Sequence, residues 1–418
     1  MIYAGVDIAK MDHVIDAVDE HGERICKSMG FKNDLAGFER CAAWLEGVAE
    51  APQDVIVGME ATGHYWMALY THLVREGYAV CVIDPMQVCA VRKFKGLARV
   101  KNDRMDAGLI AETLRIGQYD ETRLATDEVQ SLRTLTRYQQ SLKAELAEVK
   151  TQCVCLLDSY FPEYVGLWGK SNLFGSSSRA VLAKSALPRE LRRRHLASLE
   201  HDLSEASRGR RGVVAKAKEL KELARTSVGI TLGADAASFK IKSLVRQMDF
   251  LDAECAKTEQ RIKRLLDALE PLILTIPGIS YTTGAQIVAE IGDISRFRNA
   301  ASLVSYAGLN SSVNQSGMFD SGGGPITKRG SAYLRRAVWL AAGRACQHDP
   351  ALHAFYLKKM KEGKKYRVAV TAVARKMCHI IFAVLRDQVP YDPNLSGKDL
   401  AKHSISDSQR TTLPTNDQ

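Results

Sequence analysis

Four carboxylates in the first 110 residues could do chemistry together. Asp7 interrupts a short apolar run at the N-terminus, and Glu60 ends a second apolar run. Asp103 and Asp106 stand three residues apart, a spacing that places both on one face of a helix. Each acid alone has an ordinary alternative as the cap of a strand or a helix, so the argument depends on the set.

Carboxylates gathered from two strands and a helix repel one another unless cations lie between them. Carboxylate and water oxygens are the ligands that Mg²⁺ and Mn²⁺ prefer. Two such ions held ~4 Å apart can bind both the attacking and the leaving oxygen of a phosphodiester displacement. The set therefore predicts a Mg²⁺ (or Mn²⁺) site with Asp7, Glu60, Asp103 and Asp106 as ligands.

A second candidate site is a polar, glycine-rich loop at 314–325, which carries Ser316 and Ser321 and is followed by Lys328 and Arg329. Its glycines allow a ligand to approach the backbone closely. A serine hydroxyl is a weak nucleophile unless a neighbouring group activates it. Glycine and serine content alone favours a flexible loop, and from the residues alone both interpretations remain open.

Positive charge is concentrated near the C-terminus. The chain of 418 residues has a formal net charge of +10, and 328–376 holds thirteen Lys and Arg against Asp349 and Glu362. Such a bias predicts a polyanionic partner, most simply nucleic acid, whereas the alternative is a set of solvated helix faces. The candidate contacts across the chain are Lys101, Arg208, Arg210, Gly278, Lys328, Arg329, Arg335, Arg336, Lys364 and Lys365.

Several protein classes are disfavoured by composition. No run of about 18 apolar residues predicts a membrane span, and the first residues do not have the pattern of a signal peptide. The nine cysteines form no CxxC pair, which suits reduced core thiols better than disulfides or zinc. We therefore expect a cytoplasmic protein.

The elements that must position the acids follow a regular order. Apolar runs at 2–9, 13–18 and 24–30 predict an antiparallel meander, followed by a helix at 35–48, a strand at 55–60, a helix at 65–75, a strand at 79–83 and a helix from Asp103. This is the layout of a ribonuclease-H-like α/β domain with a mixed five-stranded sheet. Sites in open sheets lie at strand ends, so Asp7 and Glu60 should be neighbours.

The rest of the chain reads as mainly helical. Heptad patterns at 132–156 and 244–269 predict two long, coiled-coil-like helices, which pair with each other, with another protomer, or both. A Pro-Gly turn at 277–278 suggests a helix-hairpin-helix-like element whose turn could bind a phosphate. Helices are expected at 332–344, 350–361 and 365–387. The predicted division is 1–125, a helical spacer at 126–270, a C-terminal domain at 271–390 and a disordered tail at 391–418.

Motifs at both ends resemble one family. GVDIAK, MEATG and KNDRMDA are similar to the N-terminal, RuvC-like domain of the DEDD-type insertion-sequence transposases, which include the Piv DNA invertase. AGL, NQSG, ITKRGS and YLRRAV resemble the C-terminal serine transposase domain of that family. The resemblance implies that the four acids bind the catalytic metal and that Ser316 is the nucleophile. Ser321 is the second choice for the nucleophile because no Gln precedes it. Asn102 stands where the family motif usually has Thr, and this difference leaves the four acids unchanged.

The resemblance also implies partners: double-stranded donor and target DNA, a non-coding bridge RNA, and further copies of the chain in a dimer to tetramer. Two other enzyme classes remain open. A metal-dependent junction-resolving nuclease would use the acids and leave the Ser316 loop unexplained. An actin-like or sugar-kinase-like ATPase would need glycine-rich phosphate loops near the early strands, which the sequence lacks. A site-specific invertase is a variant of the same class.

Overall fold

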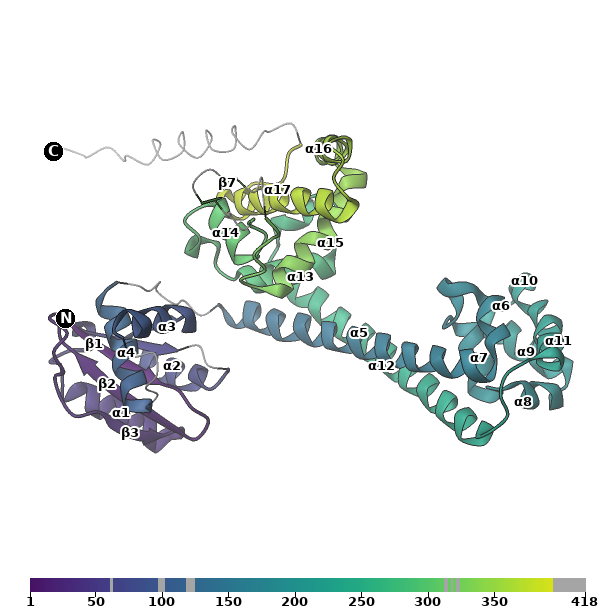
Figure 1. Ribbon diagram of the computed structural model, residues 1–418, viewed down its shortest axis with the longest axis horizontal. Helices are drawn as coiled ribbons and strands as arrows, with labels where there is room; N and C mark the ends of the chain where they lie inside the picture. The colour runs from purple at the N-terminus through teal and green to yellow at the C-terminus, as the bar shows by residue number, and fades with distance from the viewer. Residues whose placement is uncertain are drawn as a thin grey trace, which may run out of the picture. The chain divides into compact units, whose positions relative to one another are not determined.

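The computed structural model of the protein describes residues 1–60, 63–96, 102–117, 125–311, 315–316, 319–320 and 324–393. The chain forms two compact units, which divide between Leu124 and Ala125 (Figure 1). Three predictions lie outside the described residues: the contact at Lys101, the second-choice serine Ser321, and the disordered tail from 394 onward. Each unit is described by itself below.

Unit 1 is an α/β domain around one sheet. Its elements are β1 (Ile2–Asp7), β2 (Asp12–Val18), β3 (Met29–Lys32), α1 (Leu35–Glu46), η1 (Pro52–Asp54), β4 (Val55–Glu60), α2 (Trp66–Arg75), β5 (Ala79–Ile83), α3 (Pro85–Phe94) and α4 (Asp103–Arg115). The strand order is β3-β2-β1-β4-β5. β2 is antiparallel to β1 and β3, whereas β4 is parallel to β1 and β5. The predicted mixed five-stranded sheet is confirmed.

Two elements of unit 1 differ from the sequence-based expectation. The third strand begins at Met29 rather than near Arg24, because Arg24 contributes only an isolated bridge to Val18. The basic stretch after β5 contains a helix that was not predicted, α3. Asp84 caps α3 by accepting a hydrogen bond from the backbone N–H of Met86 at 2.8 Å, and Pro85 takes the first helical position.

Helices cover both faces of the sheet. α1 and α2 pack on one face over a core that includes Val6, Val57 and Met59. α3 and α4 lie on the other, where Ile110 and Leu114 are fully buried. Figure 1 shows α4 crossing the sheet, in contact with β1, β2 and β4. Unit 1 is therefore a three-layer α/β/α domain.

Two glycines allow α4 to lie this close to the sheet. Gly5 in β1 and Gly58 in β4 are partners in the parallel ladder. A Cβ added at Gly5 would lie 2.1 Å from the carbonyl oxygen of Ala107, and one added at Gly58 would lie 2.8 Å from the side chain of Leu114. The absence of side chains at this pair therefore sets the depth of α4, and with it the position of Asp103 and Asp106.

We expect Gly5→Ala to destabilise the protein by about 3 kcal/mol, because the added methyl group meets backbone that cannot move aside without shifting α4. Urea unfolding followed by circular dichroism measures the loss. Gly30→Ala in β3 is the matched control, since its nearest new contact is the carbonyl oxygen of His13 at 3.9 Å. Equal stability of the two variants would contradict a packing role for Gly5.

Unit 2 begins with a long helical hairpin. α5 (Asp127–Tyr160) packs along α12 (Ala234–Ala268). The buried positions of α5 include Leu132, Leu142 and Leu146, which the heptad pattern placed at the seam. The two long helices thus pair within one chain, while supercoiling and pairing with another protomer stay predictions.

A small helical lobe joins the two long helices. It contains α6 (Pro162–Asn172), α7 (Ser176–Lys184), α8 (Pro188–Arg193), α9 (Leu196–Ser207), α10 (Arg211–Val214) and α11 (Lys216–Thr226). Tyr164, Leu191 and Leu203 are fully buried in its core, which continues into the distal part of the hairpin.

The C-terminal part of unit 2 is a second helical core. It contains η2 (Leu272–Thr275), α13 (Tyr281–Ile291), η3 (Ile294–Arg296), α14 (Ala300–Tyr306), β6 (Gln315–Ser316), β7 (Phe319–Asp320), α15 (Ala332–His348), α16 (Pro350–Lys361) and α17 (Tyr366–Asp387). By length and composition α17 could cross a membrane. Its apolar residues that include Val373, Met377 and Ile381 are buried against the neighbouring helices of this core.

Candidate active site

The four predicted acids of unit 1 come from three elements that meet at one edge of the sheet. Asp7 ends β1 and Glu60 ends β4. Val6 and Met59, the residues before them, are partners in the parallel ladder, so the two acids follow side by side on adjacent strands. Asp103 and Asp106 lie in the first turn of α4, after the N-cap Asn102.

These acids line one cleft of about 490 Å³. The lining is completed by Ile8, Ala9, Pro85, Val88, Cys89 and Arg92. Asp106 is buried, with 6% of its surface exposed, whereas Asp103 is exposed. The structure therefore brings together the four acids that the sequence placed in one site, and β1 and α3 both contribute to the lining of the cleft.

Arg92 is a cleft residue that sequence reasoning did not single out. Its guanidinium donates to a carboxylate oxygen of Asp106 at 2.5 Å, and only 18% of the Arg92 side chain is exposed. This pair joins α3 to α4 directly at the site. The available signal was Asp84-Pro85, which starts α3 and thereby brings Arg92 to the cleft.

A second ion pair fixes the other end of α3. Glu112 of α4 accepts two hydrogen bonds from Arg115, at 2.7 and 2.8 Å, and pairs with Lys95 at 3.0 Å. The hydrogen bonds from Arg115, together with Lys95, lower the pKa of Glu112 to about 2. Glu112 therefore stays ionised at neutral pH and holds the C-terminal end of α3 against α4.

The donor chemistry of the cleft suits a hard divalent cation, since all four acids offer oxygen. Across the described parts of the chain, no three His, Cys, Asp or Glu side chains are grouped so as to hold a metal ion as they stand. Arg92 supplies the positive charge beside Asp106 in this arrangement. Metal binding would require the acids to draw together and Asp106 to exchange its guanidinium partner.

Ser316 lies in unit 2, in a short hairpin. Its strand β6 is antiparallel to β7, and Ser316 pairs with Phe319 in the ladder. The base of the loop that carries this hairpin is tied by the bridge between Ser311 and Ile326. Thr327 adds two hydrogen bonds to Asn310, one between backbones at 2.9 Å and one between side chains at 2.6 Å.

Two arginines further along the chain hold the same base. Arg375 of α17 donates to the carbonyl oxygen of Leu309 at 2.6 Å and to the hydroxyl of Ser311 at 2.8 Å. Arg335 of α15 donates to the carbonyl oxygens of Ala307 and Lys328, each at 3.2 Å. Arg335 therefore has a structural partner set besides its predicted contact with nucleic acid. Arg375 appeared in the sequence only as one of many basic residues.

The other predicted nucleic-acid contacts are mostly exposed. Exposed side chains are those of Arg208, Arg210, Lys328, Arg329, Arg336, Lys364 and Lys365. Gly278 differs, because a Cβ there would lie 2.5 Å from the backbone nitrogen of Ala345. Close packing against α15 thus explains this glycine, and a phosphate contact at its turn stays a prediction.

Comparisons with known proteins agree at both ends of the chain. A family model of the DEDD transposase of the IS110 type, described as a transposase, matches residues 4–162. A second model, described as the transposase IS116/IS110/IS902 family, matches residues 270–357. The first covers the acidic cleft and the hairpin's first helix, and the second covers the loop that carries Ser316.

Similar proteins extend over most of the chain. The mini-circle transposase of IS117 from Streptomyces coelicolor is 27% identical over 88% of this chain and 90% of its own length. The pilin gene-inverting protein of Moraxella bovis is 23% identical over 94% of this chain and 98% of its own. Among solved structures, T. thermophilus RuvC in complex with a Holliday junction substrate is 19% identical, with a TM-score of 0.23, over 28% of this chain and 98% of RuvC.

Two family models match this chain, and its similarity to transposases extends over nearly its full length. The four acids of the chain line one cleft. The chain is a transposase, an enzyme that catalyses DNA strand exchange, and it belongs to the IS116/IS110/IS902 family.

Proposed function

We propose that this transposase cuts and rejoins donor and target DNA with divalent ions bound by Asp7, Glu60, Asp103 and Asp106, and with Ser316 as the nucleophile. The observation that carries the proposal is one cleft lined by all four acids, two at adjacent strand ends and two in the first turn of α4. Mg²⁺ or Mn²⁺ bound there would polarise a phosphodiester and stabilise the charge that develops during its displacement.

The residues of this chain divide the remaining work. The hydroxyl oxygen of Ser316 forms a bond to phosphorus, its proton passes to solvent, and the bond from phosphorus to the departing sugar oxygen breaks. Lys328 and Arg329, both exposed just after the loop, can stabilise the negative charge of the transition state. A hydroxyl on the joining strand later reverses the step and releases Ser316.

Guidance by a non-coding bridge RNA is the further part of the proposal. The motifs shared with the family support it, and the net charge of +10 suits a partner of this kind. Base pairing can read sequence while the protein holds the backbone. We also propose a dimer to tetramer on DNA, a cytoplasmic location, and the division of unit 2 into spacer and serine domain at about residue 270.

Site-specific inversion is a second candidate that uses the same chemistry. The similarity to pilin gene-inverting proteins over nearly their whole length favours it. Inversion and transposition differ in the arrangement of the two DNA sites, not in the residues at the cleft.

The test is reconstitution from purified parts. We expect nucleic acid that copurifies with the protein to contain one abundant RNA, and that RNA, added with Mg²⁺ and with donor and target DNA, to yield joined products. Sequencing of the product junctions reads the outcome. Omission of the RNA or addition of EDTA should abolish joining. Cutting without joining, unaffected by removal of RNA, would instead indicate a junction-resolving nuclease.

A further inference from the structure

A basic surface on the helical hairpin shares no residue with either candidate site. Two adjoining hollows, of about 520 and 410 Å³, lie between α5 and α12 and share Leu135, Arg261 and Arg264. The first is also lined by Gln130, Ser131, Thr134 and Leu265, and the second by Tyr138, Glu254, Lys257, Thr258 and Gln260. We call these two hollows together the hairpin groove.

The two arginines of the hairpin groove are available for a ligand. Arg261 and Arg264 are three residues apart on α12, so they share a face, and both are exposed. In the part of the chain that the structure describes, neither guanidinium has a hydrogen bond or an ion pair.

Two acids of the same helix segment are engaged elsewhere. Glu254 pairs with Lys257 at 2.7 Å, and Glu259 accepts a hydrogen bond from Thr282 of α13 at 3.1 Å. Neither of these two acids therefore neutralises the positive charge of Arg261 or Arg264.

The lining of the groove matches one ligand chemistry. Guanidinium, hydroxyl and amide side chains are the groups that contact phosphate and sugar in protein–DNA complexes. Gln130 and Ser131 present such groups from α5, whereas the hydroxyl of Thr134 donates to the carbonyl oxygen of Gln130 at 3.1 Å. Single-strand binding surfaces instead carry several aromatic platforms for base stacking. Among the described residues, Tyr138 is the one aromatic side chain lining the groove, so the lining favours the backbone of a duplex.

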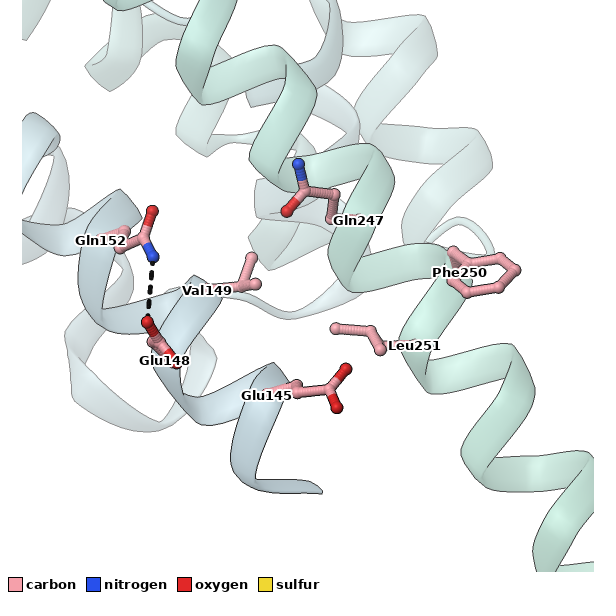
Figure 2. Close-up of a pocket in the computed structure, with 7 residues that line it drawn as sticks. All are labelled: Glu145, Glu148, Val149, Gln152, Gln247, Phe250 and Leu251. Atoms are coloured by element: carbon pink, nitrogen blue, oxygen red, sulfur yellow. Dashed lines mark hydrogen bonds between the residues drawn. The ribbon is translucent and has the colours of Figure 1, made fainter. Parts of the chain in front are cut away.

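The distal part of the hairpin has the opposite character. Figure 2 shows a pocket there, between the same two helices, lined by Glu145 and Glu148 beside Val149, Leu251 and an outward-pointing Phe250. These two carboxylates would repel a phosphate, because among the described residues neither pairs with a Lys or Arg, whereas Glu254 of the hairpin groove pairs with Lys257. The phosphate-binding character is therefore confined to the hairpin groove and does not extend along the whole hairpin.

We propose that the hairpin groove binds the phosphodiester backbone of double-stranded DNA through Arg261 and Arg264. The proposal deepens the proposed function, because it says where unit 2 holds duplex DNA outside the residues that do chemistry. Binding at the groove involves no bond breaking, so it can be measured with EDTA present and without strand exchange.

The experiment measures the affinity of the full-length protein for a fluorescently labelled duplex of arbitrary sequence, by anisotropy over a range of salt concentrations. The variant is Arg261→Gln with Arg264→Gln. We expect the dissociation constant at ~0.1 M salt to rise by roughly tenfold or more. The slope of log K against log salt should fall by about 0.9 for each phosphate that the variant no longer neutralises.

The matched control is Lys240→Gln with Arg246→Gln, which removes the same charge from exposed positions of α12 outside the groove. Its binding should stay close to that of the wild type. Equal weakening in both double variants would show a net-charge effect and overturn the proposal, as would unchanged binding in the groove variant. Weakening for an RNA hairpin but not for the duplex would also overturn it. Asp7→Asn and Ser316→Ala should bind normally here, which separates this test from that of catalysis.

Discussion

Asp7→Asn should lower the rate of strand exchange by at least about a thousandfold, equivalent to about 4 kcal/mol, while DNA binding stays near that of the wild type. Asp7 lines the cleft at the end of β1, and under the proposed function its substitution removes the charge of a metal ligand and not a contact with phosphate. Glu60→Gln and Asp103→Asn should behave alike. The measurement is product formation in Mg²⁺ beside duplex affinity in EDTA.

Asp106→Asn should lose activity and stability together. The substitution would remove the ion pair between Asp106 and the largely buried Arg92. Glu39→Gln is the control for all four variants, because Glu39 is exposed on α1, on the opposite face of the sheet. A direct readout of metal binding is the rise in melting temperature with Mn²⁺, which Asp7→Asn should reduce and Glu39→Gln should not. Full activity of Asp7→Asn in Mg²⁺ would refute the metal-ligand assignment.

The edge of the sheet that carries Asp7 and Glu60 was predictable from the sequence because two short apolar runs mark the strands that meet there. The short apolar run that Asp7 interrupts and the one that Glu60 ends predict buried strands, and the parallel ladder of β1 and β4 then places both acids at one edge. The predicted start of the helix at Asp103 agrees with the structure, in which Asn102 is the N-cap. The apolar runs do not predict how closely α4 packs on the sheet. That distance depends on the contact between Gly5 and Ala107, which are more than 100 residues apart in the chain.

Helix α3, which lines the cleft, was not predicted because its sequence resembles a charged surface segment. Within α3 only Val88 and Val91 are buried, so the apolar pattern is weak. The stronger signal is Asp84 followed by Pro85, an N-cap with proline at the first helical position. Arg92 consequently appeared as one basic residue among several, whereas the structure pairs it with Asp106.

In unit 2, local patterns predicted helices and not their tertiary partners. The heptads gave both long helices, and α16 and α17 begin within one residue of the expected positions. The base of the Ser316 loop instead depends on Arg375, 66 residues beyond Leu309. No periodicity relates two such positions, so only folding of the whole C-terminal core identifies Arg375 as a residue that positions the loop.

Ser316→Ala should abolish both strand exchange and the covalent protein–DNA intermediate. If the hydroxyl of Ser316 attacks phosphorus, a phosphoserine link to DNA must form transiently, and alanine offers no nucleophile. The antiparallel pairing with Phe319 fixes the backbone of Ser316 in β6, while Arg375 and Thr327 hold the base of its loop, so the substitution should leave the fold intact. A denaturing gel with labelled DNA, nicked to trap the intermediate, detects the adduct, and peptide mapping locates it.

The control separates Ser316 from its neighbour. Ser321→Ala should keep both the adduct and strand exchange, and Ser316→Cys should keep a small fraction of activity because a thiol is still a nucleophile. An adduct that maps to Ser321, or that persists in Ser316→Ala, would move the nucleophile elsewhere in the loop. Mg²⁺-dependent cutting with no adduct in the wild type would leave the acids of unit 1 as a nuclease site and would remove the serine from the mechanism altogether.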